Sequence, residues 1–568
     1  MKKLFVVYLL LMLTVAVSAI PAKPGKLRLA TKDGSSVEVT LVGDEFHHDF
    51  VTSDGFIVRE QDGCYVVTDR RFDRSQAESQ RLKARSHRAQ PMKAPESMSG
   101  SEAYSKGLVI LVSFSDKAFT ETAENFSNLL NEEGYDYNGA TGSVKDYFNA
   151  VSYGQYNPTF DVYGPYTLPK TMSYYGSNSG GYGNDSHPDQ MVVDAVARLV
   201  EEQGDTILRR YDCDNDGYVD NVFIYYAGYA ESSGAPSNTI WPHRWIVSDW
   251  YVTGQTTYAG KTIYDYACSS EYDGTYGNRR TGIGAFCHEF SHVLGLPDLY
   301  VTTDSYYNTP ATPEDWDIMD AGCYNNNENT PPAYSSEERF YVGWLTPTVI
   351  NQSGNYTLPN LNDSAKAFLI SSTGQHNLRG DNPNPKNYYL FENRQKKGWD
   401  KYLPGHGMLV WKIQYSAGRW QANTVNNSAD NMGCTIVSAK DPDNFVNRSA
   451  SAGDPFPGSR NVTSYVPYGN YLLSGITERG NQVSFTLSVG SGVEDAEMAD
   501  GIVMFSVDGE NYTLDNLPEG ASLRCYDATG RILWSADNVG TTYTFRNGRG
   551  MFVIQVVADG KVCVLRGI

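Results

Sequence analysis

The feature that most constrains this chain is the short run from His288 to Asp298, which places metal-binding side chains on one helix. Residues four apart lie on the same face of an α-helix, so His288 and His292 can bind one Zn²⁺ ion together. Glu289 lies next to His288, where its carboxylate can take a proton from a water molecule on the metal. The run therefore predicts a helix that carries a zinc pair and a general base.

The end of the same run predicts a sharp turn. Gly295 can adopt the left-handed conformation that ends a helix, and Leu296-Pro297 prevents the helix from resuming. The turn can bring Asp298 back to the metal as a third ligand. A fourth position then stays open for water, which is typical of catalytic rather than structural zinc sites.

A simpler interpretation is an ordinary amphipathic helix whose histidines are satisfied core groups. The apolar residues do recur at helical spacing, namely Ile283, Phe286, Phe290, Val293 and Leu294. However, a helix needs only one buried face, and the opposite face would still carry both histidines and Glu289. We therefore favour the zinc site.

The run resembles the zinc motif of the immune inhibitor A family, whose members are secreted bacterial metallopeptidases related to the metzincins. Metzincins usually have a third His where Asp298 stands, and the resemblance assigns the third ligand position to Asp298. The segment Trp316–Gly322 resembles the Met-turn of the family. In that resemblance Met319 packs beneath the metal and does not bind it.

The resemblance extends along much of the chain. Further segments that resemble the family are 107–116, 387–395 and 405–411, so the likeness runs from about residue 20 to about residue 480. It implies an α+β protein with a zincin-like catalytic domain, made of a sheet and an active-site helix. A small pro-segment would precede this domain, and β-sandwich-type domains would follow it.

The N-terminus predicts export from the cytoplasm. Lys2-Lys3 precedes an apolar run from Leu4 to Val17, and Val17-Ser18-Ala19 places small residues at the offsets of a signal peptidase site. Residues 1–19 are therefore interpreted as a signal peptide. No other apolar run is long enough to span a membrane, and we expect a secreted protein, extracellular or at the cell surface.

Charge and cysteine content exclude other classes of protein. The net charge of −20 repels a phosphate backbone, so nucleic-acid binding is not expected. Eight Cys in 568 residues do not make a disulfide scaffold.

The chain is long enough for several domains. We expect a propeptide with a basic linker over 20–98, a catalytic domain over 105–348, a β-rich domain over 349–490 and a C-terminal β domain over 499–568. Within the catalytic domain, the pattern predicts strands over 108–114 and 222–226. It predicts helices that begin after the N-cap residue Ser143, over 188–199 and over 281–294.

The first domain is interpreted as a removable inhibitor of the second. Arginines and lysines are concentrated between Arg70 and Lys93, and Ser, Pro and Gly follow. We expect cleavage within this stretch to release the active enzyme. The thiolate of Cys64 could block the zinc, although a Cys on a strand is more often a packing residue.

A second metal motif is predicted upstream of the zinc run. Oxygen ligands at alternate positions and a Gly for a sharp turn match the first part of a calcium loop, with Asp212, Asp214, Asp216, Tyr218 and Asp220 as its ligand positions. Phe223 stands where an EF-hand has its bidentate Glu, so the loop is not an EF-hand. The alternative is a polar turn, and we favour calcium because four close carboxylates repel one another without a cation.

Weaker candidates have structural interpretations beside the functional ones. His243 is read as a structural histidine more readily than as a catalytic one. Tyr324 could donate to an oxyanion, but tyrosine is abundant in this chain. His47 and His48 are expected at the surface of the pro-segment.

These patterns predict a secreted zinc endopeptidase that acts on proteins or peptides, with Glu289 as general base. One alternative is a secreted adhesin or polymer-binding protein with a non-catalytic zincin fold, and another is a metal-dependent deacetylase or esterase. The C-terminal domain resembles the sorting domains of Bacteroidetes-type Por secretion, which implies a contact with secretion machinery. An Ig-like accessory domain is the alternative for that region.

Overall fold

The computed structural model describes residues 18–567 apart from several short segments. The segments left out are 74–75, 78, 81–103, 179–183, 249–250, 303–309, 469–470, 490–501, 507–510, 528–530, 547–551 and 559–560. Most of the predicted signal peptide and most of the basic linker therefore lie outside the described residues. The described part is a mixed α+β structure, as predicted.

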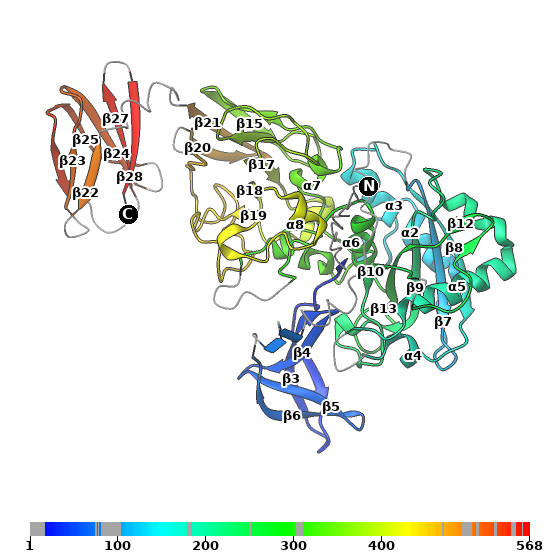
Figure 1. Cartoon of the computed structure of the whole chain (residues 1–568). Helices are drawn as coiled ribbons and strands as arrows, with labels where there is room; N and C mark the ends of the chain where they lie inside the picture. The colour runs from blue at the N-terminus through cyan, green and yellow to red at the C-terminus, as the bar shows by residue number, and fades with distance from the viewer. Residues whose placement is uncertain are drawn as a thin grey trace, which may run out of the picture.

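The N-terminal unit is an antiparallel sheet in which the strands follow one another in sequence order (Figure 1). Its strands are β2 (Leu27–Ala30), β3 (Ser36–Asp44), β4 (His47–Thr52), β5 (Phe56–Gln61) and β6 (Cys64–Arg71). The sequence pattern did not predict β4, which forms because it pairs with β3 on one side and β5 on the other.

The central sheet has six strands in the order β1-β10-β13-β9-β7-β8. The strands are β1 (Ser18–Ala19), β7 (Lys106–Ser113), β8 (Thr159–Thr167), β9 (Val222–Tyr229), β10 (His243–Ile246) and β13 (Asp265–Tyr272). Strands β13, β9, β7 and β8 are parallel, whereas β10 is antiparallel to β13. Strands β7 and β9 are buried along almost their whole length, as expected for parallel strands covered on both faces.

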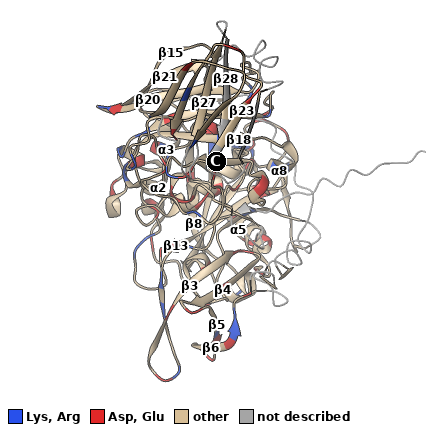
Figure 2. Cartoon of the chain, turned by 90° about the vertical axis from the view of Figure 1, so that its left-hand side faces the viewer, with Lys and Arg blue, Asp and Glu red and all other residues tan. Residues whose placement is uncertain are grey.

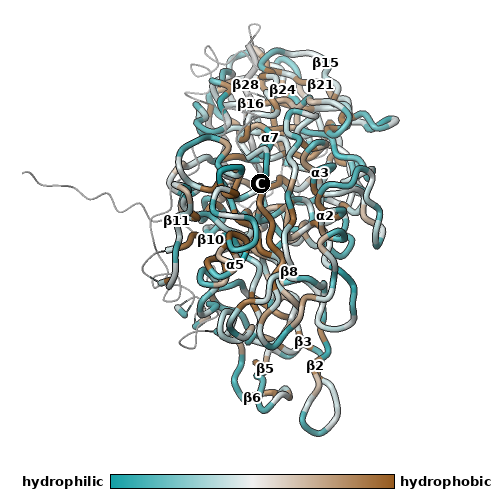
Figure 3. Tube along the Cα trace, turned by 90° about the vertical axis from the view of Figure 1, so that its right-hand side faces the viewer, coloured by the Kyte–Doolittle hydropathy of each residue, from teal (hydrophilic) through white to brown (hydrophobic). Residues whose placement is uncertain are grey.

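Helices α2 (Ala123–Asn131), α5 (Pro188–Gln203) and α6 (Gly284–Val293) pack against this central sheet. Helices α3 (Val144–Val151) and α4 (Met172–Gly176) pack on these helices, and α7 (Ser336–Tyr341) packs against a strand of the next sheet. The predicted N-cap is confirmed, because Ser143 and Asp146 form a capping box at the start of α3. Figure 3 shows the most hydrophobic segments gathered in the interior around β10 and β8.

Two further sheets follow and enclose a second core. The larger has the order β14-β16-β17-β18-β19, with strands Thr348–Val349, Phe368–Ser371, Asn387–Arg394, Gly407–Gln414 and Cys434–Val437. The smaller has the order β15-β21-β20, with strands Gly354–Pro359, Gln482–Val489 and Tyr471–Arg479. Residues of both sheets share one hydrophobic cluster, while Leu390 and Trp411 of the larger sheet belong to the cluster of the central sheet.

The C-terminal unit is a pair of sheets around a third core (Figure 1). One sheet contains β22 (Val503–Ser506), β23 (Asn511–Asp515) and β26 (Tyr543–Arg546). The other contains β24 (Ala521–Asp527), β25 (Ile532–Val539), β27 (Phe552–Ala558) and β28 (Lys561–Gly567). No helix in the described part of the chain is long and apolar enough to cross a membrane.

Candidate metal centre

Helix α6 packs one face against the central sheet through aromatic side chains. The ring of Phe286 lies 4.1 Å from that of Phe223 on β9 and 5.0 Å from that of Phe160 on β8. Gly284 lets the start of the helix approach the Met-turn segment, because a Cβ there would lie 1.9 Å from the carbonyl oxygen of Cys323. These contacts fix which face of α6 is turned away from the sheet.

The predicted turn at the end of α6 is confirmed. Gly295 has φ 95°, and its N–H donates to the carbonyl of His292 at 3.0 Å. The N–H of Leu296 donates to the carbonyl of Ser291 at 3.1 Å, which completes a Schellman motif. The chain reverses here and returns Asp298 to the helix.

Three buried ligand atoms converge at this turn. The Nε2 atoms of His288 and His292 are 3.2 Å apart, and each lies 3.1 Å from Oδ1 of Asp298. Four ligands at the usual distances around one Zn²⁺ ion are about 3.3 Å from one another. The three residues therefore fit a tetrahedral metal site with one position left over.

Backbone carbonyls orient both imidazoles. Nδ1 of His288 lies 2.6 Å from the carbonyl oxygen of Ile318, and Nδ1 of His292 lies 2.7 Å from that of Leu296. A carbonyl oxygen can only accept a hydrogen bond, so each Nδ1 carries the hydrogen and each Nε2 can present its lone pair to a metal. Ile318 precedes Met319, which is fully buried, so the Met-turn segment supports the site directly.

Asn423 orients the third ligand, and nothing in the sequence pattern indicated it. The Asn423 amide nitrogen donates to Oδ2 of Asp298, and its amide oxygen accepts from the Asp298 backbone N–H at 2.6 Å. Asn423 follows α8 (Ala417–Gln421), far along the chain from the helix that carries the histidines. In the sequence, Asn423 stands in a short Asn-rich stretch, and nothing in that pattern indicates that it orients a metal ligand.

The electrostatics of the site depend on burial and on the close charges. Burial alone raises the pKa of Asp298, but the imidazoles of His292 and His288 outweigh this effect and hold it below its usual value. Burial lowers the pKa of His292, which favours the neutral imidazole that a metal requires. Burial and the charge of Asp298 raise the pKa of Glu289 well above its usual value.

The start of the N-terminal segment lies in the cleft above Glu289. The backbone N–H of Ile20 donates to Oε1 of Glu289 at 3.0 Å, and Ile20 is almost fully buried. Ser18 and Ala19 form β1, which pairs antiparallel with β10 and is the edge strand of the sheet. The segment thus extends the central sheet by one strand and places the N–H of Ile20 on the Glu289 carboxylate.

Side chains of the cleft hold three successive carbonyls of this segment. Tyr300 donates its hydroxyl to the carbonyl of Ala19. Trp241 donates its indole N–H to the carbonyl of Ile20 at 2.9 Å. Tyr324 donates its hydroxyl to the carbonyl of Pro21 at 2.6 Å. The cleft therefore binds main-chain atoms of an extended peptide.

His243 has a structural environment. Its Nδ1 lies 2.6 Å from the carbonyl oxygen of Trp241, and its Nε2 lies 2.9 Å from the hydroxyl of Tyr266. The residue is buried on β10 beside β1. Both ring nitrogens are engaged, in agreement with the structural interpretation.

The prediction that His47 and His48 lie on the surface is wrong. Both side chains are about nine-tenths buried, because β4 faces the unit built on the central sheet. Nε2 of His48 lies 3.0 Å from Oε1 of Glu231, and the His48 ring lies 4.7 Å from that of Trp241. The polar character of the two histidines suggested exposure, whereas domain packing buries them.

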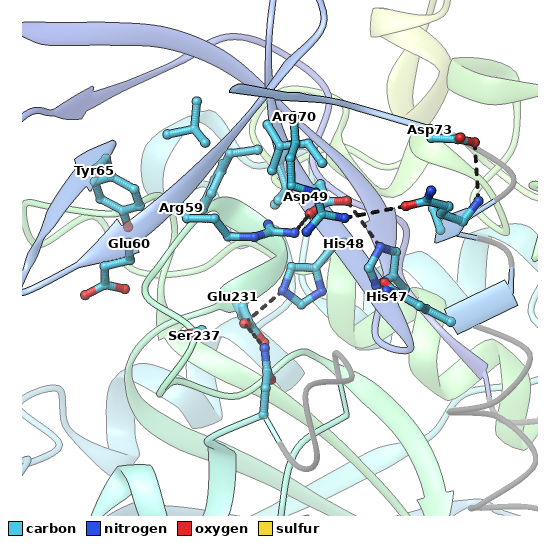
Figure 4. Close-up of a pocket in the computed structure, with 18 of the residues that line it drawn as sticks. His47, His48, Asp49, Arg59, Glu60, Tyr65, Arg70, Asp73, Glu231 and Ser237 are labelled. Carbon is cyan, nitrogen blue, oxygen red and sulfur yellow. Dashed lines mark hydrogen bonds and ion pairs between the residues drawn. The ribbon is translucent and has the colours of Figure 1, made fainter. Parts of the chain in front are cut away.

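A cavity of about 410 Å³ lies beside this contact, between the N-terminal sheet and the unit built on the central sheet. Figure 4 shows His48 directed at Glu231, and the next residue, Asp49, directed at Arg59. The cavity wall is built from charged and polar groups of both units. The two units therefore meet through polar contacts as well as through the buried Ile20.

The predicted calcium loop is only partly assembled. Carboxylate oxygens of Asp212, Asp214 and Asp216 lie within 4.8 Å of one another, whereas Asp220 is outside this group and accepts from the N–H of Cys213. Lys261 forms an ion pair with Asp212, and the side chain of Tyr218 is exposed. Calcium binding at this loop stays a prediction.

Comparison with known proteins gives a family for the central part of the chain. Residues 93–344 match the family model described as "Immune inhibitor A peptidase M6, catalytic domain". The chain is 28% identical over 242 residues to the pre-pro-metalloprotease PrtV of Vibrio cholerae serotype O1, a match that covers 39% of this chain and 24% of that protein. It is 26% identical over 288 residues to immune inhibitor A of Bacillus thuringiensis subsp. alesti, covering 44% of this chain and 42% of that protein.

The chain thus spans less than half the length of these two relatives. A solved structure of PorZ, a surface component of the type-IX secretion system of Porphyromonas gingivalis, matches 32% of this chain and 21% of that one at 13% identity. Its TM-score of 0.12 is too low to indicate a shared fold. By its family match and by its metalloprotease relatives, the stretch from residue 93 to residue 344 is similar to the catalytic domain of the immune inhibitor A-type metallopeptidases.

Proposed function

We propose that this protein is a secreted zinc endopeptidase that hydrolyses peptide bonds within proteins. The observation that carries the proposal is the convergence of His288, His292 and Asp298 beside Glu289, with a peptide amide already placed on the Glu289 carboxylate. The donor set of two imidazoles and one carboxylate suits Zn²⁺. A bound Zn²⁺ would polarise the peptide carbonyl and acidify a water molecule.

Glu289 would act as the general base and then as the general acid. Its carboxylate takes a proton from the attacking water and passes it to the nitrogen of the leaving amine. The position of that nitrogen is suggested by Ile20, whose N–H lies 3.0 Å from Oε1. A substrate bound in the same register would be cut at the bond that precedes the residue in the place of Ile20.

The substrate would bind as an added strand. Strand β10 offers a free edge once β1 is absent, and main-chain pairing at such an edge binds extended peptides without regard to their sequence. Tyr300 would donate to the carbonyl of the cleaved bond, and Trp241 and Tyr324 would hold the next two carbonyls of the substrate. Binding of the peptide main chain favours an endopeptidase over a deacetylase. A binding protein without catalysis would need no general base, so the adhesin alternative does not account for Glu289.

The proposal includes synthesis as an inactive precursor. Residues 19–23 fill the cleft, and no substrate can reach Glu289 while Ile20 is bound there. The sequence predicts signal peptidase cleavage after Ala19, which would make Ile20 the first residue and place its amino group on Glu289. The contacts of Trp241 and Tyr324 with the segment do not depend on residues before Ile20.

Cleavage near the end of β6 is expected to activate the precursor. Arg70 and Arg71 are exposed at the end of this strand, where Figure 2 shows a group of basic residues. Activity should rise at least about 100-fold as this site is cut, because the N-terminal segment is then no longer tethered and can dissociate from the cleft. N-terminal sequencing of the active protein should place its start after residue 70.

An active secreted protein that still begins near Ile20, with the segment intact, would contradict this part of the proposal. The control is the Glu289→Ala precursor, which cannot cut itself and should keep the segment until trypsin is added. Sequencing both proteins separates self-activation from cleavage by another protease.

A second expectation concerns Asn423. Replacing Asn423 by Gly should lower zinc affinity about 10- to 100-fold, because Asp298 loses the amide that fixes its orientation. Gly is chosen because Asn423 has φ 51°, a conformation that Gly adopts without strain. Competition with a zinc chelator measures the affinity, and Asn355→Gly at an exposed position of β15 is the control. Equal zinc affinities in both variants would contradict this role.

The proposal also includes a zincin-like arrangement of the central sheet. It is supported by β10, which is antiparallel to the parallel strands beside it and becomes the edge of the sheet when β1 is absent. Calcium at Asp212, Asp214 and Asp216 would stabilise the loop before β9. The C-terminal pair of sheets would serve in export, by contact with secretion machinery.

A further inference from the structure

The ammonium group of Lys23 is held in an acidic pocket at the end of the cleft. Lys23 forms an ion pair with Asp273, and its Nζ lies 3.4 Å from Oε1 of Glu328. The side chains of Asp273 and Glu328 are only 1% and 5% exposed. The ring of Tyr324 lies below the ammonium group, with its centroid 5.5 Å away. Two carboxylates and one aromatic face thus surround a single cation.

The pocket needs a cation that the catalytic unit does not supply. Arg279 pairs with Asp273, and Thr281 donates its hydroxyl to Oε2 of Glu328 at 3.1 Å. Two carboxylates therefore face one guanidinium, which leaves one negative charge for Lys23 to balance. Burial raises the pKa of Glu328 and Lys23 lowers it. When the N-terminal segment leaves, Glu328 loses the cation of Lys23.

The position of Lys23 along the segment is fixed by backbone contacts. The N–H of Ile20 is on Glu289, and the N–H of Lys23 donates to the carbonyl of Ser232 at 2.8 Å. Between them Tyr324 holds the carbonyl of Pro21. The segment is thus bound at successive positions, and Lys23 stands three residues after the one whose amide faces the carboxylate.

We propose that Asp273 and Glu328 form a specificity subsite for Lys or Arg at the fourth residue after the cleaved bond of a substrate. The inference rests on the proposed endopeptidase function and on the register of Ile20. In the precursor Lys23 fills the subsite as a substrate side chain would. After activation the pocket lies open to the cleft and selects basic side chains by charge.

The test uses four internally quenched peptides that differ only at the fourth residue after the cleaved bond, which is Lys, Arg, Ala or Glu. For the activated protein we expect kcat/KM to be about tenfold higher with Lys or Arg than with Ala, as for a partly buried ion pair. Mass spectrometry of the fragments locates the bond that is cut. Equal values for the four peptides would overturn the proposal.

The matched variants are Glu328→Gln and Glu201→Gln. Glu328→Gln keeps the shape of the side chain and removes its charge, so the ratio of Lys to Ala kcat/KM should fall to about one. Glu201 is exposed on α5 and pairs only with Arg198 among the described residues. Its replacement should leave the ratio at about tenfold. An unchanged ratio in Glu328→Gln would contradict the role of this carboxylate.

A binding measurement keeps the test independent of catalysis and of the folding of the Glu328 variant. A labelled peptide with the sequence of residues 20–25 is titrated into activated protein that carries Glu289→Gln. The Lys23→Ala peptide should bind about tenfold more weakly, and equal affinities would overturn the subsite. If the Lys peptide binds better but no quenched peptide is cut by the unaltered protein, the endopeptidase function fails while the subsite stands.

Discussion

Replacing Glu289 by Ala is expected to lower kcat/KM for protein cleavage by about 10³-fold or more while zinc stays bound. The carboxylate contributes none of the three converging ligand atoms, so the metal site should survive its loss. Only the proton transfer to and from the attacking water is removed. Casein hydrolysis measures the activity, and elemental analysis of the dialysed protein measures the zinc.

Glu289→Gln separates the loss of the base from the loss of the contact with Ile20. Gln retains an oxygen that can accept the N–H of Ile20, so the precursor should keep its segment in the cleft, whereas Ala removes that contact. Both variants should be inactive after activation with trypsin. His292→Ala is the comparison in which zinc and activity are lost together. Casein cleavage by a clean, zinc-loaded Glu289→Ala preparation would end the assignment of this residue as the base.

Replacing Arg394 by Met is expected to lower the free energy of unfolding by about 3–5 kcal/mol. Arg394 is fully buried on β17, with its Nε 2.7 Å from Asp400 and its Nη1 3.2 Å from Glu392. It also donates to the carbonyl of Ala333 at 2.8 Å, which ties the β region to the catalytic unit. Met would leave Glu392 and Asp400 buried without a cation.

Thermal unfolding of the Glu289→Ala precursor, which cannot digest itself, measures the effect. A loss of about 3–5 kcal/mol should lower Tm by about 10 °C for a domain of roughly 200 residues. The control is Arg379→Met, because Arg379 pairs with Asp381 at an exposed site and should contribute less than about 1 kcal/mol. A similar, small change in both variants would show that the buried network does not stabilise the fold.

The local structure of the metal helix could be predicted because its determinants are local. The spacing of His288 and His292 places them on one face, and Gly295 followed by Leu296-Pro297 determines the turn. The start of the helix could not be placed as well, since the pattern predicts residue 281 and α6 begins at Gly284. Thr281 is drawn out of the helix by its bonds to Glu271 and Glu328, which are contacts distant in sequence.

The partners of the site residues depend on packing between distant segments. Asn423 reaches Asp298 from 125 residues along the chain, and the N–H of Ile20 reaches Glu289 from 269 residues away. The same holds for His48, which looks like a surface residue in the sequence but is buried against Glu231. Neither composition nor periodicity contains information about such pairings.

The sequence by itself determined which groups can meet a metal, because helical spacing and a glycine turn act within one short segment. Only the tertiary structure decided what orients Asp298 and what fills the cleft, because those contacts arise when separate sheets pack together. It also decided that Lys23 meets Asp273 and Glu328. Buried charges can be paired only after the whole chain has brought their elements into contact.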